Sequence, residues 1–284
     1  MVPRMRFNIM VFSLALVGTH ASPLAAEKLP LWEAGIGAFG MTLPDYRGSD
    51  QSSGYVYPFP YIRYRGELLR MDDRRGLAAL RLLDTDRAEL NLSLNASQPA
   101  RSDSDNARHG MPDLDPTVEI GPVLRIKLWE SIDRENELTL QLPVRAAFAL
   151  DGLNPDYIGV AFNPVIDWFM RDAGPAGGWR FGVQAGPLFT TQRYNEYFYQ
   201  VDPKFATLQR PAYEASGGYS GTQFTLSLNK RFNSIWVSTF VRAYDLHGTT
   251  FDDSPLLKQR YAVLAGVGLA YVFAESKTRV EAED

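Results

Sequence analysis

The clearest pattern in this chain is a strict alternation of apolar and polar residues over stretches of about ten residues. Within residues 218–231, Phe224, Leu226 and Leu228 lie on one side of an extended chain, and the polar residues between them lie on the other. Residues 89–96 repeat the pattern, with leucine at 90, 92 and 94 and polar residues between. A period of two with one polar side indicates β-strands that are exposed on one face only.

Twelve segments carry strand signals of this kind. They are predicted at 32–42, 58–64, 67–72, 76–83, 89–96, 117–129, 137–150, 157–170, 178–189, 218–231, 235–244 and 261–273. Several are as long as the ~9–11 residues that a tilted strand needs to cross the hydrocarbon core. The pattern favours an all-β, antiparallel transmembrane barrel over a soluble β-sandwich, whose strands also alternate. About twelve strands are predicted, and ten is the alternative because segments 67–72 and 76–83 are short.

The connections between these segments mostly alternate between long and short. Long spans are predicted at 43–57, 97–116, 190–217 and 245–260, and tight turns at 65–66, 84–87, 171–177 and 232–234. Antiparallel strands place alternate connections at opposite ends, so one end has short periplasmic turns and the other has long extracellular loops. The five tryptophans all fall beside short connections: Trp32, Trp129, Trp168, Trp179 and Trp236. This grouping predicts an aromatic belt at one membrane interface.

The N-terminus has the features of a secretory signal peptide. Arg4 and Arg6 precede an apolar run over residues 7–18, and small residues follow up to Ala26. We expect residues 1–26 to be removed, with cleavage after Ala21 as the alternative, so that residues 27–273 form the barrel and 274–284 a charged tail. Export and a barrel together predict the outer membrane of a Gram-negative cell envelope and contact with its lipid.

Composition narrows the classes of partner and chemistry. The chain has no cysteine, so an exported fold must rest on its hydrogen-bonded ladder and its packing. The net charge is −4, so the composition does not require a basic surface, and nucleic acid is not expected as a partner.

A narrow channel is one alternative function, and in it the polar faces of two strands would line a wet lumen; side chains and loops could fill a twelve-strand barrel instead. Residues expected to line the lumen are Glu119, Arg125, Lys127, Gln141 and Arg145. Four prolines also lie inside predicted strands, at 122, 143, 164 and 187. Each removes a ladder donor in a barrel that has no edge, so bulges are expected there.

Two motifs suggest chemistry, and each has a simpler interpretation. Gly35, Gly37 and Gly40 match a dinucleotide-binding pattern, but no helix or distal acid follows, so close packing in the wall is expected. Asp245 and His247 could form a base and its orienting partner, but the chain offers no defined nucleophile, and a solvated loop pair is expected. We therefore predict no catalytic residues, no cofactor site and no enzyme activity.

Two loops leave further alternatives. A hard cation could gather four aspartates around His109, but they lack the calcium-loop spacing, and no metal site is predicted: Asp103, Asp105, Asp113 and Asp115. The aromatic residues of segment 193–199 fit either a contact surface or a loop folded inward over the barrel mouth.

Several short motifs, taken in order, resemble the MipA/OmpV family of MltA-interacting outer-membrane proteins. They include residues 44–50, 58–66, 110–116 with 119–122, 142–145, 210–213, 217–221 and 253–256, and they run across nearly the whole chain after the signal peptide. The family-motif residues of unassigned role are Asp45, Tyr46, Gly48, Ser49, Asp50, Pro112, Asp113, Asp115, Pro116, Arg210, Pro211 and Tyr213.

The resemblance implies an outer-membrane barrel. For the family's namesake it implies a scaffold that joins a lytic murein transglycosylase to a penicillin-binding synthase in peptidoglycan synthesis. A narrow channel and a surface adhesin are the alternative functions. The chain departs from the usual barrel pattern because residues 274–284 follow Phe273, the aromatic residue at which the last strand would normally end.

Overall fold

The structure is a computed structural model that describes residues 28–65, 69–72, 76–80, 83–85, 87–103, 107–152, 154–173 and 177–281. Its strands are β1 (Lys28–Pro30), β2 (Trp32–Pro44), β3 (Ser52–Arg65), β4 (Leu69–Asp72), β5 (Gly76–Leu80), β6 (Leu83–Asp84), β7 (Ala88–Ser97), β8 (Thr117–Glu130), β9 (Asn136–Asp151), β10 (Asn154–Phe162), β11 (Val165–Ala173), β12 (Trp179–Thr190), β13 (Gly218–Phe232), β14 (Ile235–Asp245), β15 (Tyr261–Glu275) and β16 (Arg279–Glu281). The helical elements are α1 (Gln192–Tyr199) and the short 3₁₀-helix η1 (Pro203–Phe205). Within the described ranges, no helix is long and apolar enough to span a bilayer.

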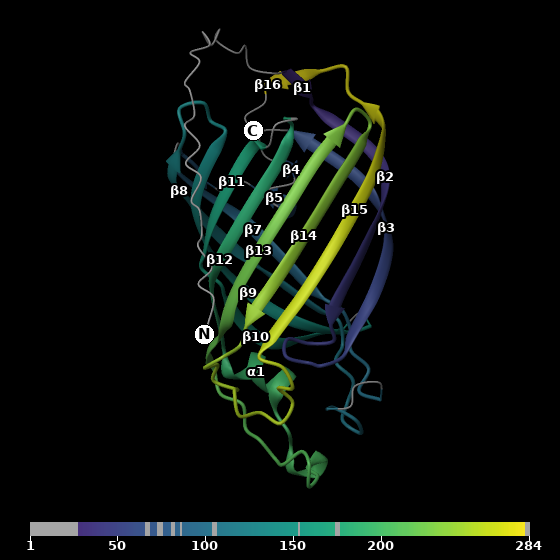
Figure 1. Cartoon of the computed structure of the whole chain (residues 1–284), viewed down its shortest axis with the longest axis vertical. Helices are drawn as coiled ribbons and strands as arrows, with labels where there is room; N and C mark the ends of the chain where they lie inside the picture. Colours follow the sequence, from purple (N-terminus) through teal and green to yellow (C-terminus); the bar gives the residue numbers. More distant parts are fainter. Residues whose placement is uncertain are drawn as a thin grey trace, which may run out of the picture.

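The long strands form one antiparallel sheet that curls into a barrel (Figure 1). β2 pairs with β15, so the first and last long strands are neighbours, and β5 lies beside β7. β10 and β11 both pair with β9 and β12, so together they occupy one position in the wall. β5 pairs with β4 and β6 pairs with β7, so these two short strands also share one position, between β4 and β7. The described strands therefore fill twelve positions, which agrees with the sequence prediction.

The start of β3 was predicted wrongly. Residues 43–57 were expected to be a long loop, but β3 begins at Ser52 and leaves only residues 45–51 between β2 and β3. The pairing extends from Trp32↔Tyr64 to Pro44↔Ser52, so the register with β2 overrides the weak strand signal of Gly54 and the two prolines that follow it.

The outward face of β15 has the dimensions of a membrane-spanning strand. Apolar and aromatic residues at every second position from Tyr261 to Phe273 are exposed, except the partly buried Ala265, and the residues between them are mostly buried. The ten residue steps from Tyr261 to Tyr271 at about 3.4 Å, tilted by about 40°, rise about 26 Å. This height matches the ~25 Å apolar band of outer-membrane barrels, with a tyrosine at each boundary.

The tryptophans lie at the short-turn end, as expected, but they do not all face outward. The rings of Trp32 and Trp129 are 40% and 53% exposed, whereas Trp236 packs inside the barrel with its centroid 5.9 Å from that of Tyr61. Because β14 begins at Ile235, Trp236 points inward, and the missing side chain of Gly268 leaves room for the indole. The belt prediction is therefore wrong for Trp236.

The inward face differs between the two sides of the barrel. On β2 and β14, Phe39 and Phe240 stack with centroids 6.0 Å apart, over a strip of wall where Gly266 lacks a side chain. On β8, β9 and β11, four inward residues form two ion pairs. Arg145 lies 2.9 Å from Glu119, and Arg125 lies 3.8 Å from Asp167. The lumen therefore has an aromatic side and an ionic side.

The prolines in the wall mark a line of interrupted pairing. The β8–β9 ladder lapses between Val123↔Pro143 and Ile120↔Ala146, Pro164 separates β10 from β11, and the β12–β13 register shifts just after Pro187. Asn163 joins the interruptions, because its amide donates to the Pro143 carbonyl (3.4 Å) and its Nδ2 to that of Pro187 (2.8 Å). The expected irregularities are therefore present.

Two further prolines, Pro58 and Pro60, lie on a strand edge. The backbone amide of Arg65 donates to Leu31, so odd-numbered amides of β3 point toward β2 and even-numbered ones point away. Among the described residues, β4 pairs with β3 only at Tyr64 and Arg65. The prolines thus occupy positions where no ladder donor is required, which is where edge strands tolerate them.

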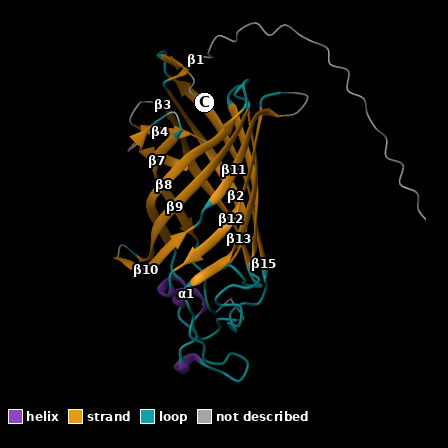
Figure 2. Cartoon of the chain, turned by 90° about the vertical axis from the view of Figure 1, so that its left-hand side faces the viewer, coloured by secondary structure: helices purple, strands orange, loops and turns teal. Residues whose placement is uncertain are grey.

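The two ends of the described chain meet at the short-turn end, away from α1 (Figures 1 and 2). β1 pairs with β16 in a two-stranded ribbon, with Leu29 opposite Val280. Leu31 donates to the Thr278 carbonyl and Ser276 to that of Trp32, each at 2.9 Å. β15 continues to Glu275, and residues 276–281 of the segment expected to be a charged tail fold back beside the start of the barrel.

Candidate functional site at the long-loop mouth

The long connections pack together across one mouth of the barrel. Figure 2 shows α1 and the loops gathered at the end opposite β1. We call the packed residues of the connections 45–51, 98–103, 107–116, 191–217 and 246–260 the plug. Its centre is the ring of Tyr199, which stacks on Phe251 with centroids 3.7 Å apart and meets Tyr46 edge-on. The aromatic residues of segment 193–199 therefore pack inward over the barrel mouth, which was one of the two alternatives predicted; the other was an exposed contact surface.

A buried polar relay fixes the plug to the wall. Arg47 Nη2 donates to the hydroxyl of Tyr194 (3.1 Å), which donates to Glu119 Oε1 on β8 (2.9 Å). The other carboxylate oxygen accepts bonds from Arg145 Nε (2.9 Å) and Asn95 Nδ2 (3.2 Å). The relay connects the β2–β3 loop, α1 and three wall strands, β7, β8 and β9, through one carboxylate.

Backbone contacts reinforce this arrangement. Tyr199 donates its hydroxyl to the carbonyl of Arg47 (2.8 Å), and Tyr46 donates to that of Leu256 (2.7 Å). Burial raises the pKa of Tyr199 to about 12, so the phenol stays neutral over the physiological range.

Two arginines organise the outer layer of the plug. Arg210 binds three backbone carbonyls, those of Phe205 (2.7 Å from Nη2), Ala107 (3.0 Å) and His109 (3.0 Å). Arg108 binds the carbonyls of Phe198 (3.1 Å) and Pro112 (3.2 Å). Each guanidinium therefore ties the β7–β8 connection to the α1–η1 segment.

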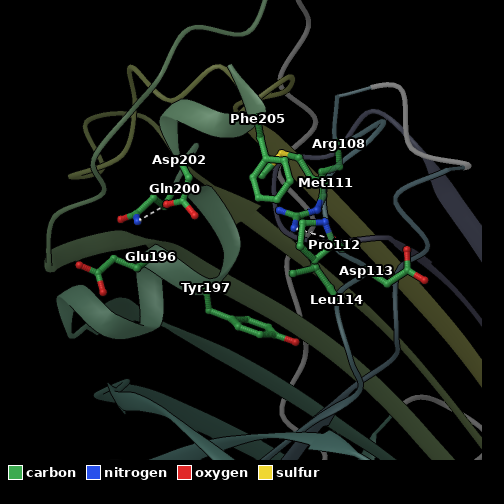
Figure 3. Close-up of a pocket in the computed structure, with 10 residues that line it drawn as sticks. All are labelled: Arg108, Met111, Pro112, Asp113, Leu114, Glu196, Tyr197, Gln200, Asp202 and Phe205. Carbon is green, nitrogen blue, oxygen red and sulfur yellow. Dashed lines mark hydrogen bonds between the residues drawn. The ribbon is translucent and has the colours of Figure 1, made fainter. Parts of the chain in front are cut away.

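A cleft of about 200 Å³ lies between the two segments that these arginines hold (Figure 3). Its apolar walls come from Met111, Leu114, Tyr197 and Phe205, and its charged groups are Arg108, Asp113, Glu196 and Asp202, with Pro112 and Gln200 completing the lining. Sequence reasoning missed this cleft, because its two walls are almost a hundred residues apart and neither carries a recognisable binding motif.

The family-motif residues of the first loop shape its turn. Asp45 accepts a hydrogen bond from Ser53 (3.0 Å), Ser49 is buried and accepts one from the Gln51 amide (3.1 Å), and Asp50 is exposed. Gly48 has φ +94°, a conformation that favours glycine, and its carbonyl accepts bonds from Lys258 and Gln259.

The other motif residues hold the β7–β8 and α1–β13 connections. Asp113 accepts a hydrogen bond from the Ser102 amide (2.7 Å), and the carbonyls of Asp115 and Pro116 accept bonds from Tyr197 (3.3 Å) and Leu150 (2.9 Å). Tyr213 pairs with Val201, and Pro211 beside it is exposed. These residues build the plug and the cleft.

The residues expected to line the lumen lie in three places. Glu119 and Arg145 belong to the relay, and Arg125 and Gln141 both meet Asp167, with Gln141 Nε2 2.6 Å from its carboxylate. Lys127 lies near the short-turn end, is partly exposed and pairs with Glu130 at 3.3 Å.

The residues considered for metal binding, catalysis and dinucleotide binding lie in separate parts of the structure. Asp105 lies outside the described residues, and among those described no group of three or more acidic or histidine side chains could hold a metal ion. His247 Nδ1 lies 2.6 Å from Asp245, with both side chains about half exposed. Gly35, Gly37 and Gly40 lie within β2, where an added Cβ at Gly37 would meet the ring of Phe59.

Comparison with known proteins places this architecture in a family. The model for "MltA-interacting protein MipA" matches residues 36–273. The chain belongs to the MipA family. Outer membrane protein OmpV of Vibrio cholerae is 30% identical over 250 residues, covering 85% of this chain and 86% of the relative. Omp26La of Vibrio anguillarum is 29% identical over the same shares.

Two solved structures resemble this MipA family protein at low sequence identity. The COG4313 outer membrane channel from Pseudomonas putida is 12% identical with a TM-score of 0.42, covering 89% of this chain and 100% of that one. OprB from Pseudomonas putida is 7% identical with a TM-score of 0.41, covering 85% and 94%. The family relatives are named as outer membrane proteins, which agrees with the apolar band and belt of the barrel.

Proposed function

We propose that this MipA family protein is a non-catalytic outer-membrane scaffold of the peptidoglycan synthesis machinery. In this role it brings a lytic murein transglycosylase and a penicillin-binding synthase together at its short-turn, periplasmic end. The family description names an interaction with MltA, and this is the first support for the proposal.

The observation that carries the proposal is the β1–β16 ribbon. Murein enzymes reach an outer-membrane barrel from the periplasm, so their contact surface must lie at the short-turn end. There the chain adds a two-stranded ribbon beyond the membrane-spanning wall, with Lys28, Arg279 and Glu281 among its residues. Among the described residues, the outer edge of β16 is one to which an extended partner segment can add by backbone hydrogen bonds. The β1 edge is less open, because Pro30 has no amide donor and its carbonyl accepts a bond from Arg65 Nη1 (2.6 Å).

The plug supports the same assignment of ends. It crosses the opposite mouth and buries its aromatic residues against wall residues such as Ala147 and Leu188. A scaffold needs a stable, closed barrel as an anchor, and the relay through Glu119 supplies such a closure.

Co-purification from cross-linked envelopes tests the scaffold. The transglycosylase and the synthase should be recovered with the full chain and lost when residues 279–284, which include β16, are deleted. Arg210→Gln is the matched control, because it changes the opposite end of the barrel. Heat-modifiable gel migration reports that each variant still forms a barrel. Recovery that is absent from the full chain, or unchanged by the deletion, would refute the proposal.

A narrow channel is the second candidate, and the ionic side of the lumen favours it. Arg125, Asp167 and Gln141 form a polar group on the inward wall, and such groups line ion pathways. Planar-bilayer recording decides between the two. Steady, ion-selective current from the pure protein would support the channel and count against a closed anchor.

A further inference from the structure

The wall of the barrel has a seam where the two ends of the sheet do not pair. The described sheet ends at β5 on one side and at β6 on the other, and β3, β4 and β7 lie on the same side of the barrel (Figure 2). Asp72 pairs with Gly76, so the β4–β5 hairpin reaches only to about the level of Arg63 on β3. Among the described residues, β3 from Ser52 to Ile62 and β7 from 91 to 97 therefore have no ladder partner on the sides that face each other across the seam.

The seam lies at membrane depth. Phe39 on β2 pairs with Tyr57 on one side and with Gly268 on the other, and Gly268 lies within the apolar band of β15. The outward side chains of β3 beside the seam are apolar, with Val56 75% and Ile62 58% exposed. Lipid chains are therefore the molecules that surround this part of the wall.

Two prolines disfavour closure of the seam by another strand. Even-numbered amides of β3 point toward the seam, and Pro58 and Pro60 supply none at its centre. A strand from a partner or from a second copy would find no donor at these two positions. At the outer end, the Tyr57 hydroxyl donates to Gln98 across the seam (2.8 Å). Side chains and lipid, rather than a strand, therefore occupy this part of the wall.

An apolar surface lines the inside of the barrel directly behind the β3 edge. It consists of inward side chains at alternate positions of β2, β3 and β14, which we call the lumen strip: Phe39, Met41, Tyr55, Phe59 and Phe240. Phe39 and Phe240 stack with centroids 6.0 Å apart, and every member of the lumen strip is only partly buried. Covering such apolar surface is favourable by about 25 cal/mol per Å².

We propose that the seam admits an acyl chain from the surrounding bilayer, and that the chain lies along the lumen strip inside the barrel. The strip offers it apolar and aromatic contacts at the depth where acyl chains lie outside the wall. The plug crosses the long-loop mouth, so the seam is the route from the membrane to the strip. The chain can belong to a phospholipid or to a free fatty acid, because both present the same methylene surface. This site is independent of the scaffold role at the short-turn end.

Trp236 can report on the interior, because its ring and that of Phe39 both border the space over Gly268. In the test, the other four tryptophans are replaced by phenylalanine and the full chain is reconstituted in phosphatidylcholine vesicles whose oleoyl chains are brominated. Bromine quenches indole emission at contact, so Trp236 should emit severalfold less than in unbrominated dioleoyl phosphatidylcholine. In a second arm, brominated stearic acid is added to unbrominated vesicles. Quenching in the first arm identifies a phospholipid tail, and quenching in the second arm alone identifies a free fatty acid.

Met41→Glu should remove most of this quenching, because a carboxylate on the lumen strip disfavours an acyl chain beside it. Gln223→Glu is the matched control, since it adds a carboxylate to the inward face of β13, three strands from β2, and should leave quenching unchanged. Heat-modifiable migration reports that each variant forms a barrel.

Photolabelling of the unmodified chain gives a readout that needs no tryptophan variant. A fatty acid that carries a diazirine on its chain should label inward residues of β2 and β3. The proposal is overturned if neither brominated lipid quenches Trp236, if Met41→Glu leaves the quenching unchanged, or if the photolabel is confined to outward residues.

Discussion

Removing one hydroxyl should loosen the plug without unfolding the barrel. In Tyr194→Phe, the bond from Arg47 (3.1 Å) and the bond to Glu119 (2.9 Å) are both lost. A hydrogen bond to a charged group contributes about 1.5–3 kcal/mol. Glu119 retains its ion pair with Arg145 at 2.9 Å. The two lost bonds together should therefore cost about 3 kcal/mol, the lower end of their combined range. Local opening of the plug should therefore become more frequent by a factor of about 150.

Hydrogen exchange resolved by peptide is the assay. Amides of α1 should exchange about two orders of magnitude faster in the variant, whereas amides of β13 and β14 should keep their rates, because opening of the plug leaves the ladder intact. Tyr219→Phe is the matched control: its hydroxyl bonds Thr222 (2.7 Å) at an exposed position. The reasoning fails if α1 exchange changes by less than about twofold, or if the control produces the same acceleration.

Three further outcomes test the wall and the plug. Gly186→Ala should lower the free energy of unfolding by about 1–3 kcal/mol in urea, because its Cβ overlaps a facing backbone carbonyl, whereas Gly54→Ala meets no atom within 4 Å and should be neutral. Asn163→Ala should cost about 1–2 kcal/mol, since the Pro187 carbonyl loses its donor; an unchanged unfolding midpoint would contradict this. Folding favours the protonated phenol of Tyr199, so its contribution to stability is complete below pH ~10 and is lost as the pH rises through about 12. In a pH titration followed by phenolate absorbance, the ionisation near pH 12 should be smaller in Tyr199→Phe than in the wild type.

The wall was predictable from sequence because its rule is local. Alternation along β13 and β15 identifies the lipid-facing side, and the order of long and short connections separates the two ends. Prediction failed where pairing overrides local signals. β3 begins six residues before its predicted start, because its register with β2 carries it through Gly54 and Pro58.

The plug could be predicted only as one of two alternatives. The aromatic residues of α1 indicated a packing or contact role, but nothing local shows that Tyr194 meets Glu119, 75 positions away. The cleft depends on Arg210 reaching carbonyls about a hundred residues earlier, and backbone acceptors carry no sequence signature. The resemblance supplied the motifs, and the structure gives them a mechanical role.

The β1–β16 ribbon has a practical consequence. Lys28 lies opposite Glu281, so polypeptides fused just before Lys28 and just after Glu281 would emerge side by side at the short-turn end. The two halves of a split reporter placed there would reassemble only in molecules whose last strand has joined the first. The reporter signal would then show that the barrel has closed. A cell-based screen could use this signal to distinguish chains that complete insertion from chains that do not.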